Sequence, residues 1–185
     1  MQVIISMLNL QSEYTKDEKY LKIFKDSQNR IESMALIHEK LYRSGNLAKV
    51  DFKDYIRSLT DELFRFHGRV NDISFKIEAE DIFFDIDTAI PCGLIINELV
   101  SNSLKHAFPN GREGEIKIAL RSTDRDEIEL TISDNGIGIP ESLDFRNTDT
   151  LGLHLVTILV EHELQGKIEL NRDKGTEFKI KFKEI

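Results

Sequence analysis

The apolar positions divide the chain into a helical first part and a mixed second part. Apolar residues recur every three or four positions over residues 1–13, 18–43 and 52–66, and this spacing predicts three successive helices. The polar segment 14–17 separates the first two, so we expect an antiparallel helical hairpin. Such a hairpin is too thin to bury its own apolar seam. We therefore expect it to pack on the following domain or on a second copy of itself, with a dimeric four-helix bundle favoured.

The second part of the chain alternates apolar and polar residues in short runs, which indicates strands. Ser44-Gly45-Asn46 carries helix-stop chemistry, so we expect a helical unit at 1–46 and a larger unit at 47–185. Asp51 is expected to cap the third helix. The order of elements predicts an α+β fold in which helices cover one face of a mixed sheet. The expected strands are 73–78, 82–84, 115–121, 127–133, 167–170 and 177–182, and the remaining helices are 87–108, capped by Asp87 or Thr88, and 151–164.

The helix that contains residues 97–108 has two faces of different chemistry. Glu98, Asn102, Lys105 and His106 lie about one turn apart on one face. A carboxylate, an amide oxygen and two basic groups in a row suit a polyphosphate bound with a metal ion. An isolated pattern of this kind is more often a solvated helix face, so the choice between the two interpretations depends on the rest of the chain. The other face is an apolar stripe that would pack on a core, made of Ile96, Leu99, Val100, Ser103, Leu104 and Ala107.

Three glycine-containing segments follow this helix in the sequence. Asp134-Asn135-Gly136-Ile137-Gly138 comes directly after an expected strand, where backbone can approach a ligand and a buried carboxylate can select an exocyclic amine. Taken alone, this segment is more often a simple turn. Gly152 lies at an expected helix start, where free N–H groups favour phosphate, and Gly175-Thr176 precedes the last strand. Together with the polar helix face, the ordered set predicts a nucleotide site.

Composition narrows the classes of partner. The chain has 185 residues and a formal net charge of −8, which argues against nucleic acid as the default partner. Cys92 is the single cysteine, so neither a disulfide framework nor a zinc cluster is expected. No apolar run approaches the length of a membrane span. We therefore expect a cytoplasmic location.

Residues from about 70 to 185 resemble the Bergerat-type ATP-binding domain shared by histidine kinases, type II topoisomerase subunits, the Hsp90 chaperone and mismatch-repair ATPases. This resemblance implies an α/β sandwich that binds ATP and Mg²⁺. It implies that Asn102 coordinates the Mg²⁺ and that Lys105 and His106 approach phosphate. Glu98 occupies a position that is polar in the kinases and a general base in the ATPase branches.

The resemblance also assigns the glycine segments. It implies that Asp134 bonds the adenine amino group, with Gly136 and Gly138 in the same motif, and that residues 139–150 form a short ATP lid. Thr176 would lie near Asp134 and share an ordered water with adenine. The remaining motifs are matched by Leu151-Gly152-Leu153 and by Gly175-Thr176.

The first third resembles the hairpin of a histidine kinase class whose phosphoacceptor lies in an H-R-x-K-N-N segment. The acceptor is then expected roughly six residues before Met1, outside this chain, so this polypeptide is not expected to phosphorylate itself. His38 is a weaker acceptor candidate, and a packed or capping histidine is the favoured interpretation. The intact enzyme would transfer the γ-phosphoryl group of ATP to a histidine and then to an aspartate of a response regulator. Alternatives are a GHKL-type ATPase, an anti-sigma type protein serine kinase and a non-catalytic dimerisation module.

Overall fold

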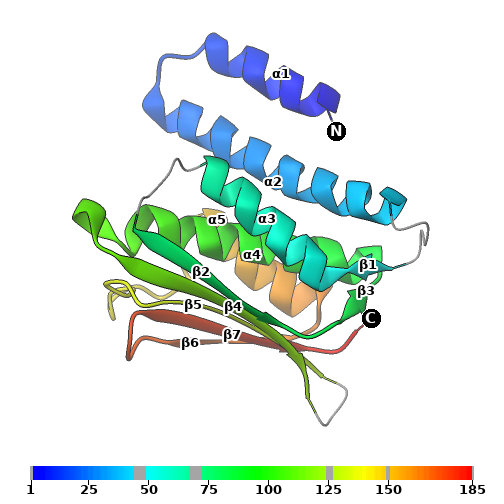
Figure 1. Cartoon of the computed structure of the whole chain (residues 1–185). Coiled ribbons are helices and arrows are strands. Elements are labelled where there is room, and N and C mark those ends of the chain that lie inside the picture. The colour runs from blue at the N-terminus through cyan, green and yellow to red at the C-terminus, as the bar shows by residue number, and fades with distance from the viewer. Residues whose placement is uncertain (1, 44–48, 67–71, 124–126, 149–150, 185) are drawn as a thin grey trace.

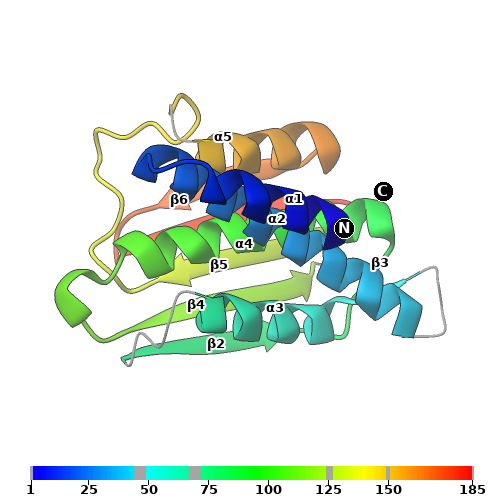
Figure 2. The same ribbon diagram turned by 90° about the horizontal axis from the view of Figure 1, so that it is seen from above.

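The computed structural model describes residues 2–43, 49–66, 72–123, 127–148 and 151–184. It has the α+β fold that the hydrophobic pattern predicts, with helices stacked on one face of a mixed sheet (Figures 1 and 2). The helices are α1 (Gln2–Glu13), α2 (Glu18–Arg43), α3 (Phe52–Phe66), α4 (Ile86–His106) and α5 (Leu151–Ile158), and the strands are β1 (Val50–Asp51), β2 (Ile73–Ala79), β3 (Phe83–Phe84), β4 (Gly114–Ser122), β5 (Ile128–Asp134), β6 (Lys167–Asn171) and β7 (Thr176–Phe182).

The main sheet has the strand order β2-β4-β5-β7-β6. Strands β2 and β4 run parallel and the other neighbours are antiparallel, so the sheet is mixed. Strands β1 and β3 form a separate antiparallel pair. The register of β5 against β7 sets Asp134 opposite Thr176. This pairing brings together two residues that the sequence analysis assigns to one end of a nucleotide site.

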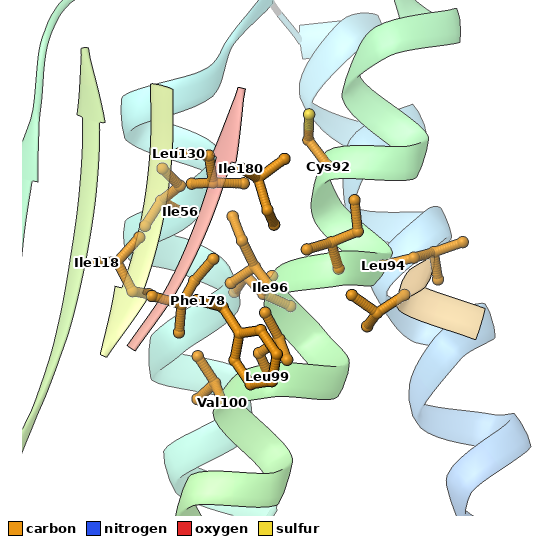
Figure 3. Close-up of a cluster of buried hydrophobic side chains, with 14 of the residues drawn as sticks. Ile56, Cys92, Leu94, Ile96, Leu99, Val100, Ile118, Leu130, Phe178 and Ile180 are labelled. Carbon is orange, nitrogen blue, oxygen red and sulfur yellow. The ribbon is translucent and has the colours of Figure 1, made fainter. Parts of the chain in front are cut away.

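The core lies between the main sheet and α4. Apolar side chains of β4, β5 and β7 face those of α4 across this layer (Figure 3). On α4, Ile96, Leu99 and Val100 are almost fully buried, as the three-and-four spacing predicts. The opposite face of the same helix is thereby fixed in direction and carries the polar residues of the candidate site. The sheet residues in this layer include Ile118, Leu130, Phe178 and Ile180.

The hairpin lies on the second part of the chain, with α2 on α3 and α4 and with α1 outermost (Figure 1). Ile37 of α2 is fully buried, and the Tyr55 hydroxyl of α3 donates to the Ser33 carbonyl oxygen at 3.4 Å. Both side chains pack over Gly93 of α4, where a β-carbon would lie 2.3 Å from the Tyr55 hydroxyl oxygen. The three helices therefore meet in one close contact. The division at residues 46 and 47 stays a prediction.

Local chemistry explains where the structure departs from the predicted elements. Asp51 caps α3 as expected, with its Oδ1 accepting from the Asp54 N–H at 3.0 Å. The prediction that Asp87 or Thr88 caps α4 is wrong. Asp85 has extended backbone and its Oδ1 accepts from the Thr88 N–H at 2.9 Å, so α4 begins two or three residues earlier.

Two further predictions on helices need correction. The helix expected to continue to residue 164 changes after α5 into a π-helical turn, Leu159–Glu163. His38 is exposed and does not lie in a packed seam; among the side chains of α2 that the structure describes, the buried ones are Asn29, Ser33, Leu36 and Ile37. None of the helices in the described ranges is both long and apolar enough to cross a membrane.

Candidate functional site

A cavity of about 450 Å³ lies between α4, the sheet and the segment that follows β5. We call it the adenine cavity, after the role that the sequence predicts for it. Its walls are largely apolar, with Ile132, Leu143 and Phe178 among them, and such walls suit a flat ring. Seven of the predicted site residues line it: Asn102, His106, Asp134, Gly138, Gly152, Leu153 and Thr176.

Asp134 supplies the charge at the base of the adenine cavity. Its carboxylate is buried at the end of β5, where Oδ2 accepts from the Ser103 hydroxyl at 2.7 Å. Its Oδ1 accepts from the N–H groups of Gly136 at 3.0 Å and Thr176 at 3.3 Å. These bonds hold the carboxylate in one orientation in an apolar cavity, where it can accept from an exocyclic amine.

Ser103 is a site residue that the sequence analysis missed. It was assigned to the apolar stripe of α4 because it follows the three-and-four spacing, and it is indeed buried. Its hydroxyl bonds both the Leu99 carbonyl oxygen at 3.2 Å and Asp134. A hydroxyl inside an otherwise apolar stripe was the available signal, because buried hydroxyl groups require partners.

Gly175 lies in the turn between β6 and β7, directly before Thr176 and against the end of β5. Its φ of 100° lies in the left-handed region, and a β-carbon there would be 2.1 Å from the Asp134 carbonyl oxygen. Only glycine fits this close approach of two backbones. The Gly175-Thr176 pair therefore has a structural reason for its position beside Asp134.

A second cavity, of about 270 Å³, lies between α2 and α4. We call it the interhelix cavity. It shares Asn102, His106 and Gly152 with the adenine cavity, so the two adjoin. Glu98, Lys105 and Leu151 line only the interhelix cavity. Gly136, the remaining predicted site residue, lines neither cavity and instead donates to Asp134.

The interhelix cavity is polar and charged. Arg30 donates from Nε to Glu98 Oε1 at 2.7 Å and from Nη2 to Oε2 at 3.0 Å. The hydrogen bond to Glu98 raises the pKa of Arg30, which therefore stays protonated. Lys105 Nζ donates to Asp26 Oδ1 at 2.8 Å. Three buried oxygen atoms in its lining have no hydrogen-bond partner within the described ranges: Asn29 Oδ1, Asn97 Oδ1 and Ser101 Oγ.

The lid residues 139–148 carry neither helix nor strand, as expected for this segment. Phe145 is buried and meets the Phe178 ring edge-on at 5.6 Å, which anchors the segment to the sheet. Two polar side chains of this segment bond protein groups: Arg146 Nη2 donates to the Ile168 carbonyl oxygen at 2.8 Å, and Asn147 Nδ2 donates to Asp144 Oδ2 at 2.7 Å. The hydrogen bond from Asn147 lowers the pKa of Asp144.

The donor set fits a magnesium ion carried by phosphate better than a metal held by protein alone. The described residues contain no group of three or more His, Cys, Asp or Glu side chains that could hold a metal. Asn102, half-buried where the two cavities join, offers an amide oxygen to such an ion. Mg²⁺ commonly takes only one or two protein ligands and completes its shell with phosphate oxygens and water.

Comparisons with known proteins agree with this geometry. Residues 88–185 match a family model described as histidine kinase-, DNA gyrase B-, and HSP90-like ATPase, and residues 1–67 match one described as histidine kinase. The chain is 28% identical to sensor histidine kinase PdtaS of Mycobacterium tuberculosis over 184 residues, which cover 96% of this chain and 36% of PdtaS. It is 25% identical to blue-light-activated histidine kinase 2 of Erythrobacter litoralis over 163 residues, which cover 86% of this chain and 46% of that protein.

The chain thus spans less than half the length of these relatives. Among solved structures, the histidine kinase domain of an Erythrobacter litoralis blue-light-activated histidine kinase has the same fold. The TM-score is 0.80 at 22% identity, and the match covers 100% of this chain and 96% of that one. A catalytic domain of the histidine kinase ThkA matches 74% of this chain and 95% of its own length, with a TM-score of 0.58 at 23% identity.

Proposed function

The chain belongs to the family of histidine kinase-, DNA gyrase B- and HSP90-like ATPases, and we propose that it is the ATP-binding catalytic core of a sensor histidine kinase. The observation that carries the proposal is the buried Asp134 carboxylate in an apolar cavity that adjoins a polar, charged one. This arrangement suits adenine at one end and phosphates at the other. In this proposal the intact enzyme transfers the γ-phosphoryl group of ATP to a histidine, and then to an aspartate of a response regulator.

In this proposal the residues act by positioning and by charge neutralisation, which dominate catalysis of phosphoryl transfer. Asp134 and Thr176 hold the adenine, with Ser103 orienting the Asp134 carboxylate. Asn102 would hold the Mg²⁺, which would supply positive charge to offset that of the phosphates. Lys105 and His106 contact the phosphates, and the start of α5 at Leu151-Gly152-Leu153 presents N–H groups to them.

We also propose that the hairpin forms a homodimer. Val3, Ile4, Met7 and Leu10 of α1 are each more than half exposed, which leaves an apolar face uncovered in the single chain. A second hairpin would bury this face in a four-helix bundle. Because ATP is the proposed substrate, the reaction is proposed to take place in the cytoplasm.

The alternative functions are less well supported. A GHKL-type ATPase would use Glu98 as a general base, but both oxygens of Glu98 bind Arg30 in this structure. The anti-sigma serine kinase is disfavoured because residues 1–67 match the histidine kinase model. We therefore propose that Glu98 is a polar residue of the site and does not act as a general base.

The test replaces Asn102 with Ala. In a longer chain that includes the expected acceptor histidine, phosphorylation from labelled ATP should be lost, because the metal on the triphosphate is no longer held. In the present chain, Asn102→Ala should change the affinity for AMP little, as measured by calorimetry. The matched control is Asn147→Ala in the lid, which should retain phosphorylation. Unchanged phosphorylation in the Asn102 variant would overturn the assignment.

A further inference from the structure

Glu98 lies at the phosphate end of the proposed ATP site. A β-carbon on Gly152 would be 2.7 Å from Glu98 Oε2 and 3.9 Å from Asn102 Nδ2. The carboxylate therefore lies against Gly152, at the helix start that is proposed to receive phosphate, and the Asn102 amide lies near the same glycine. An unpaired carboxylate at this position would repel the terminal phosphates of ATP, since two like charges a few ångströms apart interact strongly outside bulk water.

The hairpin supplies the counter-ion. Arg30 pairs with both oxygens of Glu98, and the two side chains keep only 16% and 10% of their surface exposed. Such a two-bond pair fixes orientation as well as charge. The two residues are 68 positions apart in the sequence and come from α2 and α4. The charge of the phosphate end is thus set by the hairpin and the ATP-binding unit together.

We infer that Arg30 is a positioning residue of the ATP site, which neutralises Glu98 so that the site accepts a triphosphate. The inference rests on the proposed function, because it concerns the phosphate end of the same site. With this role for Arg30, the selectivity of the site for ATP over AMP depends on α2. The adenine cavity contains no residue of α2, so adenine binding itself does not depend on Arg30.

A second ion pair between α2 and α4 has the opposite effect on phosphate binding. Asp26 lies one helical turn before Arg30 and holds Lys105, which is proposed to contact phosphate. Asp26 therefore competes with phosphate for this lysine. Both side chains keep more than a quarter of their surface exposed, so the pair is weak and a phosphate can displace it.

The experiment measures dissociation constants of ATP, ADP and AMP in the presence of Mg²⁺ by calorimetry, for the whole chain and three variants. Arg30→Gln should weaken ATP binding about tenfold, with a smaller loss for ADP and none for AMP, because it exposes the Glu98 charge. The double variant Arg30→Gln/Glu98→Gln removes both charges and should restore ATP binding. Asp26→Asn should tighten ATP binding about twofold, because it releases Lys105.

Arg30→Gln and Asp26→Asn are expected to change ATP affinity in opposite directions, and this distinguishes the inference from a loosening of the hairpin. If α2 merely supported the fold, Arg30→Gln and Asp26→Asn would both weaken binding, and AMP would be affected as much as ATP. Either result would overturn the inference, as would failure of the double variant to recover. Melting temperatures identify a variant that does not fold, in which case Arg30→Lys, which keeps the charge, should bind ATP more tightly than Arg30→Met. If the wild-type chain binds neither ATP nor AMP, the proposed function fails as well.

Discussion

The two cavities on α4 are built in different ways. The adenine cavity is formed within the second part of the chain, and its one buried charge, Asp134, is fixed by neighbouring backbone and by Ser103. The interhelix cavity is formed where two parts of the chain meet, and its charges are joined in pairs across α2 and α4. The proposed base-binding end and the proposed phosphate-binding end thus share one helix but depend on different neighbours.

Because of this difference, we expect the two ends of the site to respond to different substitutions. A group held by local backbone keeps its position when a distant segment moves, whereas an ion pair between segments is lost when they separate. We expect the adenine end to act independently of the hairpin and the phosphate end to depend on it. Three substitutions test this comparison.

The largest effect is expected at Asp134. Replacing it with Ala removes the charged acceptor for adenine, and we expect affinity for ATP and AMP to fall equally, by about a hundredfold. Calorimetry with both nucleotides measures this, and Asp144→Ala in the exposed part of the lid serves as the control. A loss confined to ATP would contradict the independence of the adenine end.

A smaller effect is expected at Lys105. Its replacement by Ala removes a cation from the phosphate end and frees Asp26, so ATP affinity should fall by about fivefold while AMP affinity is unchanged. Raising the salt concentration should reduce the difference, because the pair is partly exposed. If AMP binding falls with ATP binding, Lys105 belongs to neither end specifically.

The smallest effect is expected for Tyr55→Phe, in the contact between α2 and α3. Tyr55→Phe removes one long hydrogen bond to Ser33 and should lower the free energy of unfolding by no more than about 1 kcal/mol. The matched change Ile37→Ala leaves a cavity in the same contact and should cost about 2–5 kcal/mol. Denaturant unfolding measures both. Equal losses would mean that packing does not dominate this contact.

Much of the fold could be predicted because hydrophobic periodicity reports directly on which face of an element is buried. The spacing over residues 18–43 and 52–66 predicted α2 and α3. The alternation at residues 167–170 and 177–182 predicted the paired strands β6 and β7. The first residue of α4 was missed, since Asp85, Asp87 and Thr88 are all good capping residues and only the backbone distinguishes them.

The candidate site was predicted unevenly for a related reason. Motif spacing identified Asp134 and Thr176, which the β5–β7 register then set side by side. Ser103 was hidden because it follows the apolar spacing of its helix. Arg30 and Asp26 could not be predicted, because the sequence of a long polar helix surface does not show which residues pair with a distant carboxylate or lysine.

The sequence by itself determined which helix face is apolar, where the strands lie and which residues form the nucleotide motifs. These properties follow from the spacing of neighbouring residues, and they need no knowledge of distant contacts. Only the tertiary structure decided that α2 lies along α4 and that Glu98 and Lys105 are paired with residues 68 and 79 positions away. Electrostatic partners depend on distance in space, and separation along the chain does not encode that distance.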